Sequence, residues 1–560
     1  MRKIIVTIGF ATLGGLLALA ADWPTQSGSP ERNGWARSER ILTRQNIGHL
    51  QVLYKFHAEN QSRSLNFLSP PIVDGNLITY LGFKEMLVFG GSSGKIFSVD
   101  ADLNKLLWEA HLAYQSSTPQ SAVSTLACPG GMTAPVVMPG SSSASMHFAS
   151  GVRRAIIPAR PPALGPRDRP MTVVPPFDPR VTPLSATTVS HLAIFYAISS
   201  DGELHLLNSY TGEDLIAPLK FVPPNSKITS LNLWETTLYA TTADDCNGQA
   251  NALYSLDFLR PDKYVWSFTT NGSGFSGIGG TAIGRDGTVY VQVASGSNSA
   301  TGPLQDTVLA LTSKDLRVKD YFTPSGKPDR RKNVDSAGIT PTVLSWKGKE
   351  FVAAADSNGR LYLLDSTMLG GADHHTPVSQ TDPLVDRKNK KEWYGFHGTF
   401  TTWLDVDTET RWLYAPYWGA LTRSDGDAET GRLLAFKIAE SSTQPTLDQV
   451  WVSPGIRTPG PAVVANGLLF TLSSGEAPSI FKKRGKLLNP EDWERMTSPA
   501  VLYAFDAITG KQLYSSGGSI KSYSRNSGLA LANGRIYFGT HDNDVYCFGI
   551  PGTQPQLTVH

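Results

Sequence analysis

A short strand of one pattern returns eight times along this chain. Each copy begins with two small or turn residues and then alternates apolar residues, usually one aromatic among them, before ending in most copies on Asp. The copies occupy residues 94–100, 202–208, 251–257, 306–312, 359–365, 431–437, 500–506 and 543–549. Successive copies start about 43 to 72 residues apart, with one gap of 108 after the first. A unit of this length holds a four-stranded sheet with its loops and is too long for a helical pair.

The segments that flank each repeated strand predict the rest of the unit. Upstream of each copy lies an apolar segment that carries Gly, Pro, Ser or Thr, as an innermost strand requires where strands converge on an axis. These segments are 68–73, 132–138, 228–233, 279–284, 338–344, 398–404, 459–465 and 527–532. Asp-Gly or Asn-Gly at 286–287, 466–467 and 533–534 predicts a tight hairpin to the second strand, because both turn residues must accept positive φ.

An outer strand follows the repeated strand in several units, and its bulky residue stands eight positions after the Asp or Asn, as Trp108 follows Asp100. The last copy has no outer strand, whereas residues 50–56 form an unpartnered strand before the first unit. Closing the ring with that strand removes an open sheet edge. The sequence therefore predicts an all-β fold: an eight-bladed β-propeller of four-stranded antiparallel blades, closed by an N-terminal strand.

The N-terminus predicts export. Positive residues 2–3 precede an apolar stretch at 4–19, and Ala18-Leu19-Ala20 supplies a small-residue cleavage site. We interpret residues 1–20 as a signal peptide cut after Ala20 or Ala21, the alternative being an uncleaved anchor, and expect a periplasmic or secreted protein with no later transmembrane segment. Residues 21–560 then form one propeller domain with insertions near 139–190, 370–396 and 474–498. A net charge of +2 gives no reason to expect a nucleic-acid partner.

Three cysteines cannot all pair. Cys547 lies inside the eighth repeated strand and is interpreted as a small buried hydrophobe. Cys128 and Cys246 lie in loop-like sequence of consecutive units, and an oxidising compartment would allow a disulfide between them, although spacing alone does not establish one. In the third insertion, Asn489-Pro490-Glu491 predicts the N-cap and first turn of a short helix.

The repeats, above all LYAFDAITGKQLY at 502–514, resemble the repeat of the pyrroloquinoline-quinone (PQQ) propeller family. Residues 22–28 and 42–50 are similar to the opening motif of bacterial quinoprotein dehydrogenases. The resemblance implies PQQ and calcium in the axial channel and oxidation of an alcohol or sugar. The chain departs from the pattern, however: it has no adjacent cysteine pair, no C-x-x-C-H haem motif, and only a distorted form of the family's second motif near 403–419.

Polar residues beside the inner strands are the candidates for an axial cofactor site. The cofactor-binding candidates are Arg63, Asn66, Lys227, Asp335 with the adjacent Ser336, His397, Arg457, Arg525 and Asn526. Their Arg and Lys side chains suit the carboxylates of an anionic quinone. The alternative for each of them is an ordinary solvated loop residue. No catalytic residue and no metal ligand is assigned.

Four weaker features each have a structural alternative. Trp403 and Trp418 either stack on a planar ligand or pack within a sheet. The acidic run 425–429 is either a calcium loop or a solvated hairpin, and 373–375 (Asp-His-His) is a poor metal site because neighbouring His side chains diverge. The sequence thus leaves two functions open. One is an exported PQQ-like propeller, either a ligand-binding protein or a divergent PQQ-dependent oxidoreductase; the other is a noncatalytic scaffold that holds protein partners at its rim.

Overall fold

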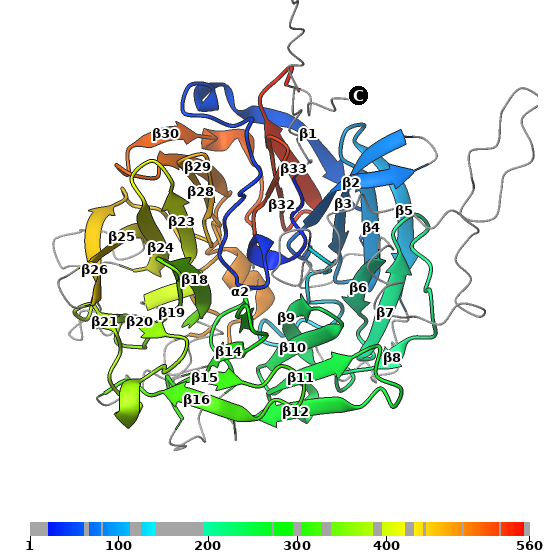
Figure 1. The fold of residues 1–560 in the computed structure, drawn as a ribbon. Helices are drawn as coiled ribbons and strands as arrows, with labels where there is room; N and C mark the ends of the chain where they lie inside the picture. The colour runs from blue at the N-terminus through cyan, green and yellow to red at the C-terminus, as the bar shows by residue number, and fades with distance from the viewer. Residues whose placement is uncertain are drawn as a thin grey trace, which may run out of the picture.

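Eight antiparallel sheets surround one axis in the computed structural model (Figure 1), which confirms the predicted eight-bladed propeller. The structure describes residues 21–60, 67–79, 82–112, 125–140, 194–270, 274–294, 304–325, 338–384, 395–419, 431–440, 444–482, 486–525 and 528–553. We number the sheets blades 1 to 8 in chain order from residue 72. The predicted signal peptide and most of the first insertion lie outside the described residues.

The strands of each blade follow one another from the axis outward. Blades 1 to 4 are β2 (Ile72–Thr79), β3 (Gly82–Gly90), β4 (Lys95–Asp100) and β5 (Lys105–His111); β6 (Ile194–Ile198), β7 (Glu203–Asn208) and β8 (Leu219–Lys220); β9 (Lys227–Trp234), β10 (Thr237–Ala243), β11 (Ala252–Asp257) and β12 (Val265–Thr269); and β13 (Ala282–Ile283), β14 (Val289–Gln292), β15 (Val308–Leu311) and β16 (Val318–Phe322). Blades 5 to 8 are β18 (Thr342–Trp346), β19 (Lys349–Ala355), β20 (Leu361–Asp365) and β21 (Ser379–Gln380); β23 (Thr401–Asp405), β24 (Thr410–Trp418), β25 (Arg432–Glu440) and β26 (Pro445–Val452); β27 (Val463–Ala465), β28 (Leu468–Ser473), β29 (Val501–Asp506) and β30 (Gln512–Ser515); and β31 (Ala530–Ala532), β32 (Arg535–Gly539), β33 (Asp544–Gly549) and β1 (Gln51–His57).

Two blades depart from the simple four-strand pattern. In blade 2 the innermost position is an isolated antiparallel bridge between Val137 and Tyr196. Blade 6 carries two additional strands, β17 (Gly338–Thr340) and β22 (Gly395–Thr399), which pair in parallel with each other while β22 also pairs with β24. Each of the eight repeated strands forms the third strand of its blade, so the repeat is confirmed as one strand per blade.

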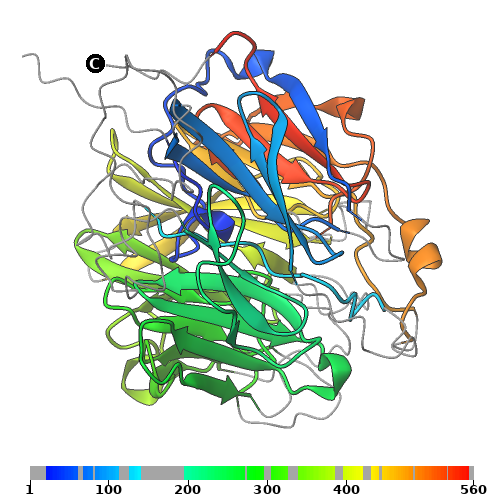
Figure 2. The same cartoon turned by 90° about the vertical axis from the view of Figure 1, so that its right-hand side faces the viewer.

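Short helices occupy the connections between strands. They are the 3-10 turns η1 (Gln26–Gly28), η2 (Ile47–His49), η3 (Cys246–Gly248), η4 (Gly371–Asp373) and η6 (Gly517–Ser519), and the α-helix α2 (Pro490–Glu494). The predicted N-cap is confirmed, because the Asn489 side chain accepts a bond from the backbone N–H of Asp492 at 2.7 Å. Figure 2 shows the ring from the side with α2 on one face, and Figure 1 places α2 near the middle of that face. Within the described residues, no helix has the length and apolar character needed to cross a bilayer.

The ring closes as predicted, with β1 as the outer strand of blade 8. The antiparallel register runs from Gln51 opposite Gly549 to His57 opposite Asp544. Two side-chain contacts support this seam: Lys55 Nζ and His57 Nδ1 lie 2.5 and 2.8 Å from the two oxygens of the buried Asp544 carboxylate. Pairing the first strand with the last leaves β33 without an open edge and joins the two ends of the ring.

Neighbouring blades are joined by tryptophans on outer strands. Trp108, on β5 of blade 1, donates from Nε1 to the carbonyl of Ser209 in blade 2 at 2.8 Å. A Cβ at Gly212, whose φ is 74°, would come within 2.5 Å of the Trp108 ring, so this turn admits only glycine. Trp451 makes the same pair of contacts from blade 6 to the Ala507 carbonyl and Gly510 of blade 7. The predicted bulky residue therefore packs between blades.

The axis itself is occupied by residues 21–36, which we call the axial segment and which lies in dark blue at the centre of Figure 1. Its backbone meets the innermost strands of successive blades in blade order. Ala21 N donates to Asn533 Oδ1 of blade 8, Trp23 pairs with Val73 of blade 1, and Pro24 O accepts from Met138 N of blade 2. Pro30 O accepts from Asn232 Nδ2 of blade 3 and from Ile283 N of blade 4. Glu31 O accepts from Val343 N of blade 5, Asn33 O accepts from Thr402 N of blade 6, and Gly34 and Ala36 pair with Val464 of blade 7. One short segment thus hydrogen-bonds to all eight blades.

Arg32 is the centre of this arrangement and is wholly buried. Its guanidinium donates to six oxygens: Gly279 O and Thr281 O at 3.1 Å, Thr25 Oγ1 at 2.8 Å, Gln26 O at 2.7 Å, Ser230 Oγ at 3.0 Å and Leu231 O at 3.1 Å. Burial lowers the pKa of Arg32 to about 9, which still leaves it charged at neutral pH. Its acceptors are carbonyl and hydroxyl oxygens, so the charge is stabilised by oriented dipoles.

We predict that Arg32→Met destabilises the protein by about 3 to 5 kcal/mol, because buried acceptors in the axial segment and in blades 3 and 4 would each lose a charge-assisted hydrogen bond. The measurement is urea unfolding followed by tryptophan fluorescence. Arg40→Met is the matched control, since the exposed Arg40 bonds only to neighbouring carbonyls at Arg37 and Glu39. Equal unfolding midpoints for the two variants would contradict a central role for Arg32.

Candidate functional site

Two of the predicted cofactor-binding residues, Lys227 and Arg525, line one pocket beside the axial segment. Lys227 opens β9 of blade 3, and Arg525 precedes β31 of blade 8, so the two cations come from separate parts of the ring. The pocket is a narrow cleft, partly open to solvent, whose free space of about 20 Å³ holds about one water molecule. The remaining wall is largely apolar and rigid: Phe67, Pro70, Pro129, Pro135, Ile228 and Ile278 contribute to it, with Thr133 and Thr229.

The two cations differ in how their charge is balanced. Lys227 Nζ lies 2.5 Å from Asp244 Oδ2, so its charge is shared with a carboxylate. Arg525 is 8% exposed, donates from Nη2 to Leu126 O at 2.6 Å, and holds its guanidinium 5.0 Å from the centre of the Trp493 ring. Among the described residues Arg525 makes no ion pair, so the pocket retains a positive charge that suits an anion.

Gln26 completes the pocket from the axial segment. Its side chain is 4% exposed, and its Oε1 has no hydrogen-bond partner among the residues that the structure describes. Arg32 fixes the position of Gln26 by donating to its backbone carbonyl. A buried acceptor without a donor costs free energy, and a ligand that carries an N–H or O–H group would relieve that cost. Sequence reasoning missed Gln26 because it lies outside the repeats, and only the resemblance of 22–28 to an opening motif marked its surroundings.

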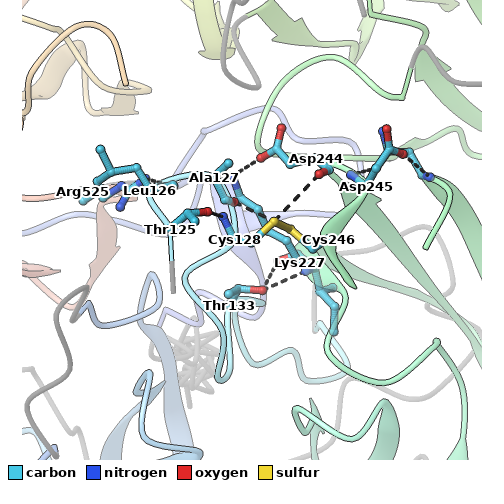
Figure 3. The surroundings of a disulfide bond; sticks show 12 residues. Thr125, Leu126, Ala127, Cys128, Thr133, Lys227, Asp244, Asp245, Cys246 and Arg525 are labelled. Atoms are coloured by element: carbon cyan, nitrogen blue, oxygen red, sulfur yellow. Dashed lines mark hydrogen bonds and ion pairs between the residues drawn. A yellow bond between two sulfur atoms is a disulfide. The ribbon is translucent and has the colours of Figure 1, made fainter. Parts of the chain in front are cut away.

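A bridging segment, residues 125–138, runs past Arg525 and Lys227, two residues of the pocket lining (Figure 3). Its Leu126 carbonyl accepts from Arg525, while Thr133 Oγ1 donates to Ile228 O at 2.6 Å and accepts from Ile228 N at 2.8 Å. Cys128 forms a disulfide with Cys246, which confirms that hypothesis: the S–S distance is 2.04 Å and the Cα atoms are 5.6 Å apart. Cys547 is buried as predicted, and burial raises the pKa of its thiol to about 12.

His397 and Arg457, also predicted for the site, lie elsewhere. His397, on β22, stacks on Trp418 with ring centres 3.8 Å apart and planes 12° from parallel. Its surface is only partly covered, yet the protein packed around the ring lowers its pKa to about 3 and keeps the imidazole neutral. Arg457, on the approach to β27, bonds through Nη2 to the Met496 carbonyl, beyond α2. Neither residue lines the pocket formed by Lys227 and Arg525.

The remaining candidates either lie outside the described residues or have structural roles. Arg63, Asn66, Asp335, Ser336, Asn526 and the acidic run 425–429 are outside the described residues. Trp403 packs in a buried cluster with Trp412 and Trp451, and Trp418 donates to Pro459 O at 2.9 Å, so both follow the sheet-packing interpretation.

The Asp-His-His run at 373–375 connects its own turn to residues 321–323 at the end of β16. Asp373 caps a turn through the backbone N–H groups of His375 and Thr376, and these bonds lower the pKa of its carboxyl. His374 stacks on Tyr321, and His375 Nδ1 lies 2.7 Å from the Thr323 carbonyl. No group of three metal-binding side chains occurs anywhere in the described ranges. The arrangement around residue 373 therefore supports packing and not metal binding.

Comparison with known proteins supports the fold and nothing finer. No family model and no curated protein matches the chain. Among solved structures, it resembles the quinohemoprotein alcohol dehydrogenase ADH IIG from Pseudomonas putida HK5 (TM-score 0.55, 12% identity, 95% of this chain and 81% of that one) and the corresponding enzyme from Comamonas testosteroni (TM-score 0.52, 12% identity, 95% and 81%). A europium-containing methanol dehydrogenase is also similar, with a TM-score of 0.52, 12% identity, and coverage of 94% and 98%. The chain thus shares the quinoprotein type of β-propeller fold.

We predict that Cys246→Ser lowers the free energy of unfolding by about 2 to 4 kcal/mol, because the disulfide closes a loop between residues 118 apart in sequence. The unfolding midpoint in urea, with and without a reducing agent, measures the effect. Reduction should destabilise the unmodified protein and leave the variant unchanged. A variant that remained sensitive to reductant would show that the loss does not come from this bond.

Proposed function

We propose that this protein is an exported propeller, periplasmic or secreted, that binds a small carboxylate-bearing molecule in its axial pocket. The observation that supports this most directly is the convergence of Lys227, Arg525 and Gln26 on one largely apolar pocket, where the side-chain oxygen Oε1 of Gln26 has no hydrogen-bond partner among the described residues. Charged groups confined by apolar walls select a ligand by the position of its polar atoms.

The pocket specifies the chemistry of that ligand in three respects. Arg525 offers charge-assisted hydrogen bonds to an anionic group, and the paired Lys227 adds positive potential nearby. Gln26 Oε1 offers an acceptor to an N–H or O–H group of the ligand. Proline and aliphatic side chains would contact an apolar body between these polar ends. PQQ, a quinone with carboxylates and a ring N–H, has all three properties and is the first candidate. The pocket walls would have to move apart to admit it, because their free space of about 20 Å³ holds about one water molecule.

A calcium-PQQ redox centre fits the described residues less well than PQQ as an anion. A hard cation such as calcium requires several oxygen ligands, usually including carboxylates, and no carboxylate is among the described residues that line the pocket. His397 is neutral and belongs to blade 6, away from the pocket lining. The described lining therefore supports binding of the carboxylates of the ligand and does not supply the donor set that calcium needs.

The competing function is a noncatalytic scaffold that holds a protein partner at the rim. Its support is a group of exposed apolar side chains at the outer edge of blade 1, where Leu103, Leu106 and Leu107 are 66%, 40% and 41% exposed. Exposed leucines on an edge strand are a feature of surfaces that pair with other chains. This function does not require the axial pocket.

We predict that the purified protein beginning at Ala21 binds PQQ, and that Arg525→Gln weakens binding at least tenfold, because one charge-assisted contact contributes about 1.5 to 3 kcal/mol. Isothermal titration with PQQ and a panel of aromatic carboxylates, with and without calcium, provides the measurement. Arg495→Gln is the matched control, since Arg495 is exposed and pairs with Asp492 and Glu491.

The same titration separates the alternatives. Calcium-dependent binding followed by dye-linked turnover of alcohols or sugars would establish the oxidoreductase, and binding without turnover would establish the ligand-binding protein. If neither PQQ nor any carboxylate in the panel binds at tens of micromolar, the axial proposal fails and the scaffold remains.

A further inference from the structure

The first described residue, Ala21, is held firmly at the seam between blades 8 and 1. It is 5% exposed, and its backbone nitrogen donates to Asn533 Oδ1 at 2.7 Å. Its carbonyl packs against Gly75, where a Cβ would come within 2.4 Å of the Ala21 oxygen. Two residues later, Trp23 exchanges both backbone hydrogen bonds with Val73 at 2.8 and 3.0 Å. The start of the axial segment is therefore a fixed contact of the ring.

The side-chain amide of Asn533, which accepts from Ala21, also contacts a buried carboxyl group. Asn533 Nδ2 donates to Glu85 Oε2 at 2.8 Å, and the Tyr537 hydroxyl donates to Glu85 Oε1 at 2.8 Å. Glu85 is 3% exposed and makes no ion pair with any described residue. The Asn533 side chain therefore presents its oxygen to Ala21 and its nitrogen to Glu85, so that a positive charge at Ala21 would lie one amide group from a buried carboxyl.

The charged groups near Ala21 and Glu85 come from β32, from the turn after β4 and from the axial segment. Arg535, on β32, pairs with Asp102 at 2.8 Å and also donates to Ala101 O, which the Tyr54 hydroxyl of β1 contacts as well. Asp22 lies next in the chain and accepts from Gly75 N at 3.0 Å. Burial raises the pKa of Glu85 to about 7 despite the proximity of Arg535. Arg535 thus lies near two carboxyl groups, those of Glu85 and Asp102.

We propose that the peptide bond between Ala20 and Ala21 is the site at which the leader is removed, and that the new α-ammonium group of Ala21 docks on Asn533, beside Glu85, to complete the closure of the ring. The reaction is a hydrolysis: water cleaves the C–N bond, its oxygen remains with the Ala20 carboxylate, and the released amine of Ala21 takes up a proton. The small residues at 18 and 20 fit such a cleavage. Cleavage one residue later would remove the Ala21 contact with Asn533. This inference does not depend on the axial ligand.

The proposal has a definite consequence for pH. When Ala21 carries only an amide nitrogen, the folded protein holds a proton on Glu85 that the unfolded chain releases near the ordinary carboxyl pKa of 4.5. The folded state then binds more protons between about pH 4.5 and pH 7, so stability falls as the pH rises through this window. An ammonium group at Ala21 favours the ionised carboxylate and makes this loss of stability smaller.

The experiment compares two disulfide-bonded proteins, one beginning at Ala21 and one carrying Gly-Ser before Ala21. We expect the exported protein to begin at Ala21 by N-terminal sequencing. We also expect the Ala21 protein to melt about 2 °C higher than the extended one at pH 7.5, and the difference to be smaller at pH 5. Glu85→Gln should abolish the difference at both pH values. Asn533→Asp, which places a carboxylate directly against the amine, should widen it.

A second measurement separates docking from a general effect of the extension. Reductive methylation at neutral pH should modify the Ala21 amine of the folded protein at least ten times more slowly than the amine of the extended protein. An exported chain that begins at another residue would overturn the proposal. Equal melting temperatures at pH 7.5, or equal methylation rates, would overturn it as well, even if Glu85→Gln did not fold.

Discussion

The structure depends on the hydrogen bonding of the axial segment to all eight blades. A propeller ring has converging inner strands with small side chains, so its centre cannot be filled by the blades themselves. Residues 21–36 fill it, and their backbone groups satisfy inner-strand groups from Val73 in blade 1 to Val464 in blade 7. Arg32 supports this path from within, since one planar guanidinium reaches oxygens of the axial segment and of blades 3 and 4.

This filling determines where a ligand can bind. The axial segment occupies the middle of the inner strands, and the pocket lies where the inner strands begin, at Lys227 of β9 and just before β31. Because Gln26 belongs to the axial segment and Pro129 to the disulfide-linked bridging segment, the pocket is built between two non-repeating elements. The repeats supply the frame, whereas the groups that distinguish this site from an ordinary propeller channel come from outside them.

The fold could be predicted from the sequence because each blade carries the same short local patterns. Small residues such as those at 459–465, turn pairs such as Asn533-Gly534, and the repeated third strand each report one step of one blade, and eight copies reinforce one another. The site was harder to predict. Lys227 and Arg525 were found because they adjoin inner strands, yet the same criterion selected His397 and Arg457, which contact Trp418 and the Met496 carbonyl instead. A position next to an inner strand in the sequence does not reveal which side of the strand the residue faces. Gln26 lies outside the repeats, so no repeated pattern marked it.

The pocket and the contact of Ala21 with Asn533 involve different parts of the axial segment, so the two are physically connected. Ala21 is fixed to blade 8, Trp23 to blade 1 and Pro24 to blade 2 before the chain turns through η1, where Gln26 faces the pocket. Residues 22–25 separate Ala21 from Gln26, and each of them is hydrogen-bonded or buried. Ala21 therefore has little freedom to shift without moving Gln26. The two sites nevertheless rest on independent contacts, with Asn533 and Glu85 at one and Lys227 and Arg525 at the other. Because Gln26 has little freedom to move, the widening that a ligand of the size of PQQ requires would have to come from the other pocket walls, among them Pro129 and Pro135 of the bridging segment.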